Sequence, residues 1–286
     1  MKIGAVMFFT TYSMQPAELA RELEDRGFES LWVPEHTHIP SSRKTAYRVG
    51  GPLIRPYYDI YDPFIALNTA AAVTTNLKIG TGIALLTQRD PIVTAKMVSS
   101  LDQISKGRFL FGVGNGWNQD EIENHGTDFK PRHVLARERI EAMKAIWTND
   151  EPEYHGQFVN FDKMQQNPKP FQKPYPPVIV GGAYPYAARR AIRYGNGWIP
   201  RADRLEEGED GIGTFIKLFH KDCIEAGRDP KELPITIFRT ADNIEQLRYC
   251  ESIGVDRIVF TLPAEPRDKL LPIMDRWQGL MKELNG

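Results

Sequence analysis

Cysteine and net charge are both scarce in this sequence. Its 286 residues include only two cysteines, Cys223 and Cys250. Two thiols form neither a disulfide framework nor a four-cysteine zinc site, and so low a count is typical of a reducing compartment, so we expect a cytoplasmic protein. Lysine and arginine total 36 against 37 acidic residues, a net charge of −1. This balance removes the usual reason to expect a nucleic acid or an anionic membrane as a partner.

Long apolar runs are also missing. None approaches the roughly 18 residues of a membrane-spanning helix, and the first residues read as a strand instead of a signal peptide. A hydrophobic fraction of 41% with 10% aromatic residues is still sufficient for a large core. The length suits one α/β barrel of about 250 residues or two smaller domains.

Short apolar segments recur along the chain. They are almost continuously hydrophobic, as parallel strands buried on both faces are. The eight segments are 3–8, 30–33, 78–86, 108–113, 178–180, 197–199, 235–238 and 257–261.

Helical patterns occupy the intervals between these segments. Asp62-Pro63 and Asp90-Pro91 each place a capping carboxylate before a proline at the first helical position. Eight β-α units with right-handed crossovers predict a single (β/α)8 TIM barrel over residues 1–286, and a doubly wound open sheet is the alternative. The expected helices are 16–26, 63–74, 91–105, 134–148, 185–194, 205–226, 243–252 and 267–284.

Three connections are long enough to be insertions, after strands two and four and before strand five. They are 34–61, 114–132 and 149–177. Long loops in compact domains usually serve function. The first holds four tyrosines, which suggests an aromatic-lined pocket. The third holds a hairpin pattern over 154–161 and a proline-rich run, 167–177, expected to lie as a strap across the barrel.

Polar residues after the strands mark the end of the barrel where active sites lie. His36 and His38 follow strand two, but no other histidine follows a strand, so no metal site is expected. His36 is instead a candidate polar contact or proton donor. Glu35 is expected to orient its loop through backbone or arginine contacts.

Glycines mark two further strand ends. The spacing of Gly112, Gly114 and Gly116 does not match a dinucleotide fingerprint or a P-loop, and we interpret these glycines as letting a flat ligand approach the backbone. Gly181-Gly182 separates a strand from a helix and predicts a phosphate site on exposed N–H groups, with Arg201 and Arg204 supplying charge. The alternative is that the two glycines only turn the chain.

Several segments resemble the luciferase-like flavin and deazaflavin oxidoreductases. The most specific is Leu-Asp-x-x-Ser-x-Gly-Arg at 101–108, followed by Gly-Val-Gly-Asn-Gly-Trp at 112–117. The likeness covers nearly the whole chain. It extends to residues 27–36, 80–83, 177–182 and 196–200. Within that superfamily the pattern is most similar to the enzymes that use coenzyme F420, an 8-hydroxy-5-deazaflavin.

This resemblance implies a redox ring at the C-terminal mouth of the barrel. A non-proline cis peptide at Thr81-Gly82 or Gly82-Ile83 would back the ring, and His36 would lie beside its reactive face. The implied homodimer would form through the helices near 64–73 and 92–104. The cofactor contacts implied are Thr81, Gly82, Ile83, Gly114, Asn115, Gly116, Trp117, Gly181, Gly182, Ala183, Arg201 and Arg204.

The activity implied is hydride transfer between F420 and a small organic substrate. An FMN-dependent monooxygenase is the first alternative, and a flavin or deazaflavin binder without catalysis is the second. F420-dependent sugar-phosphate dehydrogenases carry a glutamate proton donor where this chain has Trp117, and a tryptophan where it has Pro40, so sugar-phosphate oxidation is disfavoured. Glu121, one helical turn beyond Trp117, is the candidate catalytic substitute.

Overall fold

Eight parallel strands form a barrel in the computed structural model, which describes residues 1–42, 44–47, 50–200 and 211–286. Their order in the sheet is β10-β11-β1-β2-β3-β5-β8-β9. A parallel bridge between Trp198 and Ile235 links β9 to the start of β10 and completes the ring. The strands are β1 (Lys2–Val6), β2 (Ser30–Val33), β3 (Lys78–Thr81), β5 (Phe109–Gly114), β8 (Val178–Gly181), β9 (Trp198–Ile199), β10 (Thr236–Phe238) and β11 (Arg257–Thr261).

This closure makes the open-sheet alternative wrong and confirms the predicted barrel. All eight predicted segments contribute a strand. The third segment divides into β3 and a short β4 (Ala84–Leu85), which pairs with β5. The interruption falls at the Gly82-Ile83 peptide, which is cis, one of the two bonds expected from the resemblance.

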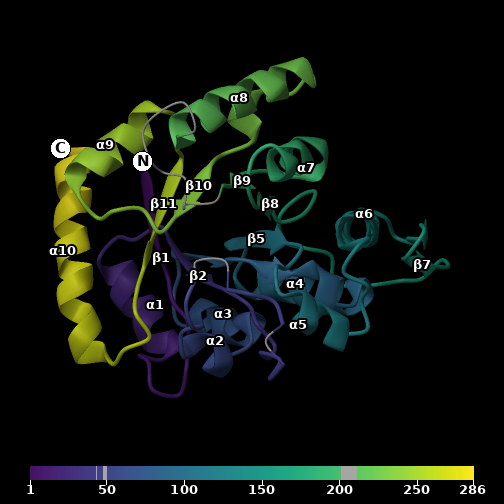
Figure 1. The fold of residues 1–286 in the computed structure, drawn as a ribbon, viewed down its shortest axis with the longest axis horizontal. Helices are drawn as coiled ribbons and strands as arrows, with labels where there is room; N and C mark the ends of the chain where they lie inside the picture. The colour runs from purple at the N-terminus through teal and green to yellow at the C-terminus, as the bar shows by residue number, and fades with distance from the viewer. Residues whose placement is uncertain (43, 48–49, 201–210) are drawn as a thin grey trace.

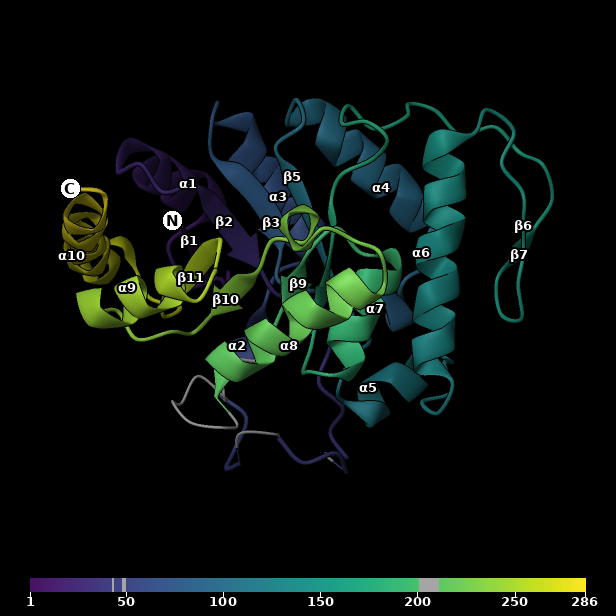
Figure 2. The same cartoon turned by 90° about the horizontal axis from the view of Figure 1, so that it is seen from above.

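Helices surround the strands, with α10 at one end of the molecule and the β6–β7 hairpin at the other (Figure 1, Figure 2). Asp62 accepts hydrogen bonds from the N–H groups of Phe64 and Ile65, and Asp90 accepts one from Val93, as the Asp-Pro pattern predicts. The long helices are α1 (Pro16–Asp25), α3 (Pro63–Ala72), α4 (Pro91–Ile104), α6 (Arg132–Thr148), α7 (Tyr186–Tyr194), α8 (Ile212–Glu225), α9 (Ile244–Ser252) and α10 (Arg267–Asn285).

Three details differ from the sequence prediction or complete it. The start of the helix expected at 205 lies outside the described residues, and α8 is described from Ile212. Two short helices, α2 (Pro56–Asp59) and α5 (Gln119–Asn124), were not predicted, because one turn or two carry too little periodicity. The predicted hairpin is present as β6 (Tyr154–His155) and β7 (Asn160–Phe161).

The barrel interior is filled by alternate residues of the strands. Trp32 is fully buried at its centre, and the half-buried Ile83 and Phe238 pack on this cluster. The ring of Trp32 lies 5.5 Å from that of Phe238. Ile83 and Phe238 therefore form an apolar floor at the C-terminal mouth. The buried members are Val6, Trp32, Leu110, Ile179, Ile199 and Val259.

No helix in the described part of the chain is both long enough and apolar enough to cross a membrane.

Candidate functional site

His36 and Glu121 form a buried pair at the C-terminal end of the barrel. His36 follows β2 and Glu121 lies in α5; His36 Nδ1 is 2.7 Å from Glu121 Oε2. The histidine side chain is 7% exposed and the glutamate 0%. Glu121 Oε1 also accepts the backbone N–H of Thr37 at 3.3 Å. An ionised carboxylate at this distance requires a proton on Nδ1, so Nε2 is the nitrogen left for a ligand.

Aromatic rings enclose His36, and we call Tyr47, Tyr57 and Trp117 the aromatic cluster. The ring centroid of His36 is 5.0 Å from that of Tyr57 and 6.0 Å from that of Trp117. Tyr47 lies 5.6 Å from Tyr57 and 5.9 Å from Trp117. Burial and the Tyr47 hydroxyl raise the pKa of Tyr57 to about 12, so this tyrosine stays protonated at neutral pH. The long loop after β2 thus supplies aromatic walls, as its tyrosines predicted.

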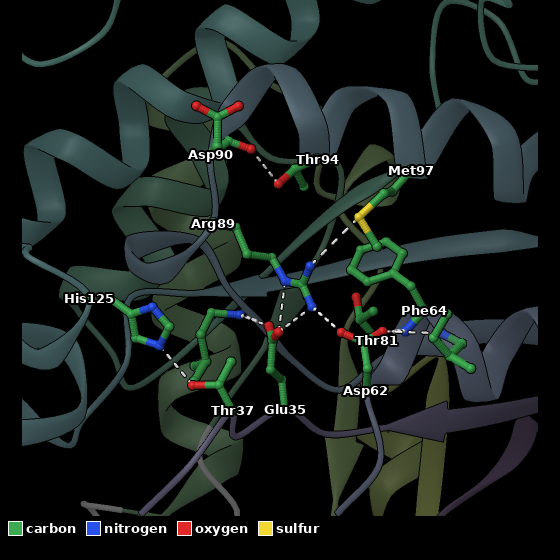
Figure 3. A network of polar contacts seen from close by, with 12 residues as sticks. Glu35, Thr37, Asp62, Phe64, Thr81, Arg89, Asp90, Thr94, Met97 and His125 are labelled. Carbon is green, nitrogen blue, oxygen red and sulfur yellow. Dashed lines mark hydrogen bonds and ion pairs between the residues drawn. The ribbon is translucent and has the colours of Figure 1, made fainter. Parts of the chain in front are cut away.

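Glu35 holds the loop that carries His36. Its Oε1 accepts from Arg89 Nε at 2.7 Å and its Oε2 from the Leu85 N–H at 2.6 Å (Figure 3). Arg89 also bonds Asp62 Oδ2 at 2.8 Å, which ties β2 to the start of α3. Burial raises the pKa of the Glu35 carboxyl, whereas Arg89 and the Leu85 N–H act in the opposite direction. The predicted orienting role of Glu35 is confirmed.

The glycines of β5 serve the packing of strand three. A Cβ on Gly112 would overlap the carbonyl oxygen of Thr81, and one on Gly114 would overlap the side chain of Ile83. Packing against β3 and Ile83 therefore explains these two glycines without a ligand, and the approach of a flat ligand to their backbone stays a prediction. The buried hydroxyl of Thr81 donates to the Gly112 carbonyl at 2.7 Å. Thr81 is fully buried, and its proposed contact with a cofactor stays a prediction.

Gly116 is required by its own conformation. Its φ is +71°, a left-handed value that favours glycine, and a Cβ there would lie 2.8 Å from the side chain of Ile122. This turn leads the chain from Asn115 into Trp117 and on to α5. Gly116 thus helps to bring both Trp117 and Glu121 close to His36.

The Gly181-Gly182 turn differs in part from its prediction. The N–H of Gly182 donates to the Ile199 carbonyl at 2.9 Å, so the expectation that it is unpaired is wrong. Ala183 follows, and its carbonyl accepts the N–H of Ala187 at 2.9 Å. Within the described residues no side chain caps the N-terminus of α7, which leaves that helix end as the candidate anion site. Arg201 and Arg204 lie outside the described residues.

Two residues beside this turn were missed by the sequence analysis, Arg190 and His133. Arg190 Nη2 would lie 3.7 Å from a Cβ on Gly182, and its Nε is buried with no partner in the described part of the chain. Burial, Arg132 and Arg190 lower the pKa of His133 to about 4, so its ring is neutral at neutral pH. Its Nδ1 lies 2.5 Å from Asn115 Nδ2, which donates to it. We call Asn115, His133 and Arg190 the basic group.

Metal ligands are not assembled in the described part of the chain. No group of three or more histidine, cysteine, aspartate and glutamate side chains there is placed to hold a metal ion. His38 instead contacts Thr37 Oγ1 at 3.0 Å and Asn124 Nδ2 at 3.0 Å.

Comparison with known proteins identifies the family. The model of the luciferase-like monooxygenase family matches residues 14–259. The chain belongs to this family. Its luciferase-like relatives include the uncharacterised protein Rv0953c of Mycobacterium tuberculosis (strain H37Rv), which is 36% identical over 288 residues, 96% of this chain and 97% of that protein.

Two solved structures of the luciferase-like fold match over nearly their whole lengths. Monooxygenase RslO1 from Streptomyces bottropensis has a TM-score of 0.80 at 18% identity and covers 100% of both chains. An F420-dependent secondary alcohol dehydrogenase, in complex with an F420-acetone adduct, has a TM-score of 0.76 at 17% identity and covers 99% of each chain. At these identities the likeness shows a common fold. The family match places the chain among the luciferase-like oxidoreductases and monooxygenases.

Proposed function

We propose that this protein transfers a hydride between coenzyme F420 and a small organic substrate at the C-terminal mouth of the barrel. The observation that carries the proposal is the His36–Glu121 pair. A histidine held by a fully buried carboxylate, with no partner on its second nitrogen among the described residues, is an arrangement suited to moving one proton. When bound, the deazaflavin supplies a ring carbon that accepts or gives a hydride.

His36 carries out the other half of the reaction, the transfer of the proton. When a carbon that bears a hydroxyl loses a hydride and becomes a carbonyl, the hydroxyl must also lose a proton, and Nε2 of His36 accepts it. The reverse reaction returns that proton to the oxygen. Glu121 is the positioning residue, because its charge holds the ring orientation and stabilises the imidazolium. Tyr57 and Trp117 limit water around the imidazole.

Two features support a phosphate-bearing ring cofactor at this mouth. The floor formed by Ile83 and Phe238 is apolar and half-buried, which suits a flat aromatic ring. Arg190, the charged member of the basic group, and the uncapped N-terminus of α7 offer positive charge, and in the described residues no carboxylate pairs with Arg190. We propose contacts to the ring from Gly82, Ile83 and Trp117, and to the phosphate from the segment 181–183 with Asn115 and Arg190. Arg201 and Arg204 are also proposed to contact the phosphate-bearing part of the cofactor.

An FMN-dependent monooxygenase is the second candidate function. The family description names monooxygenases, and RslO1 is one. An FMN enzyme would use the same floor and the same basic group, so geometry alone favours neither ring. The distinction lies in oxygen, because a flavin reacts with O₂ and a 5-deazaflavin does so poorly.

Equilibrium titration of the purified protein with each cofactor tests the proposal. We expect F420 to bind at least about tenfold more tightly than FMN, a difference of about 1.4 kcal/mol. Reduced F420 should then be oxidised by a screened organic substrate without oxygen uptake. Tighter binding of FMN, with oxygen uptake that depends on a substrate, would reverse the assignment.

We also propose that the protein works as a cytoplasmic homodimer. Both cysteines are buried free thiols. The side chains of Ile65 on α3 and Val93 on α4 are 67% and 59% exposed, on the two helices where the resemblance puts the dimer contact. Exposed apolar residues grouped on neighbouring helices are typical of an association surface.

A further inference from the structure

A cavity of about 480 Å³ opens beside the aromatic cluster, at the C-terminal ends of β10 and β11. Its volume falls within the range of about 300–1,000 Å³ that is usual for small-molecule sites. Phe8, Ile54, Leu262 and Trp277 make its walls largely apolar.

Arg239 brings a positive charge into the cavity. It directly follows β10, and its backbone has a φ of +61°, a left-handed value that side chains other than glycine rarely adopt. Its Nη2 lies 3.5 Å from the Tyr57 hydroxyl oxygen. No carboxylate of the described residues lies within 4.0 Å of its guanidinium nitrogens. Unusual backbone conformations gather at functional sites, so this outlier supports a functional reading of Arg239.

The carboxylate that lines the same cavity does not neutralise Arg239. Asp242 Oδ2 accepts from Trp277 Nε1 at 2.7 Å and pairs with Arg276, both residues of α10. Its charge is thus balanced by a different arginine. Within the described residues, Arg239 therefore keeps a positive charge that no carboxylate pairs with, inside a largely apolar pocket.

The cavity and His36 share a wall. Tyr47 lines the cavity, and its hydroxyl oxygen is 3.4 Å from that of Tyr57. Tyr57 in turn packs against the ring of His36 at 5.0 Å. A carboxylate anchored at Arg239 would therefore lie beside Tyr57, which also contacts the ring of the proposed proton donor.

We infer that this cavity binds the substrate, and that the substrate is a small organic anion with an apolar body and a carboxylate. The guanidinium of Arg239 would bind the carboxylate through two parallel hydrogen bonds. The hydroxyls of Tyr47 and Tyr57 are placed to donate further hydrogen bonds to the same carboxylate. The apolar walls would bury the rest of the molecule. This inference rests on the proposed function only in calling the ligand a substrate.

Isothermal titration of the cofactor-free protein with phenylacetate and with its neutral isostere phenylacetamide tests the inference. We expect the wild type to bind phenylacetate at least about tenfold more tightly than the amide, since a charge-assisted pair is replaced by a weaker contact. Arg239→Met should abolish the preference, and Arg239→Lys should retain part of it. Arg248→Met is the matched control, because it removes the same charge from an exposed position on α9 that pairs with Glu283.

Three outcomes would overturn the inference: no binding of phenylacetate by the wild type, equal affinities for the two probes, or a preference that survives in Arg239→Met. Titration of the same variant with F420 separates this inference from the proposed function. We expect the F420 affinity of Arg239→Met to equal that of the wild type. A loss of F420 affinity there would assign Arg239 to the cofactor and contradict the inference. A wild type that binds phenylacetate but not F420 would overturn the cofactor assignment alone.

Discussion

His36 and Glu121 are 85 positions apart in the sequence, yet His36 Nδ1 and Glu121 Oε2 are 2.7 Å apart at the mouth of the barrel. The strands β2 and β5 carry the two segments to the same end, and the turn at Gly116 leads into α5. This relationship gives the proposed chemistry a proton donor and a partner that orients it.

Replacing Glu121 with glutamine should impair turnover without weakening cofactor binding. The amide keeps the shape and one acceptor but no longer stabilises a charged imidazolium, so we expect kcat to fall by about tenfold or more, and His36→Gln to cost about 10²-fold or more. Steady-state kinetics of the two variants measure both losses.

The control for this experiment is Glu123→Gln, on the same helix but exposed. It should match the wild type. A kcat for His36→Gln equal to that of the wild type would exclude His36 as the proton donor even with the fold correct.

Replacing Arg190 with methionine should weaken the binding of a cofactor that carries a phosphate. We expect F420 affinity to fall by about tenfold, whereas the affinity for the phosphate-free deazaflavin ring should not change. Burial lowers the pKa of the Arg190 guanidinium, and no carboxylate pairs with it in the described residues. The substitution should therefore also raise the free energy of unfolding, by about 0.5–2 kcal/mol.

Arg189→Met on the same helix is the matched control, since Arg189 is exposed. Equal losses of affinity for F420 and for the phosphate-free ring would mean that Arg190 does not bind the phosphate.

Glu29 makes stability depend on pH. Although burial opposes it, the two hydrogen bonds from Arg257, each 2.7 Å, lower the pKa of Glu29 from 4.5 to about 2. Since the folded value lies below the unfolded one, this stabilisation is present above about pH 4.5 and is lost as the pH falls toward about 2. A shift of 2.5 units corresponds to about 3 kcal/mol.

Urea unfolding at about pH 6 and about pH 3 measures this contribution. The free energy of unfolding of the wild type should fall more steeply between the two than that of Glu29→Gln. Glu225→Gln, a substitution of an exposed residue that pairs with Lys221, should behave as the wild type does. Equal slopes for the wild type and Glu29→Gln would contradict the assignment.

The proposed homodimer is tested by a charge on α3. Ile65→Glu should convert the protein to a monomer in light scattering, because a buried carboxylate without a partner is costly. Ile224→Glu on α8 is the control, since that isoleucine is also 67% exposed. A wild type that is monomeric at all concentrations would remove this proposal and leave the rest intact.

The sequence predicted the elements better than the site. Strands such as 30–33 were located because parallel strands buried on both faces are continuously hydrophobic, and helix starts because Asp62 and Asp90 cap their helices. Local patterns do not determine contacts across the barrel, so Arg190 and His133 were missed. For the same reason the packing of Gly112 against Thr81 and of Gly114 against Ile83 was not predicted.

A crystal structure of the protein with F420 bound tests the central claim most directly. The account predicts the deazaflavin ring on Ile83 and Phe238, its phosphate within hydrogen-bond distance of Arg190 or the N-terminus of α7, and His36 Nε2 facing the space above the ring. A ring bound elsewhere, or a phosphate far from residues 181–190, would contradict it.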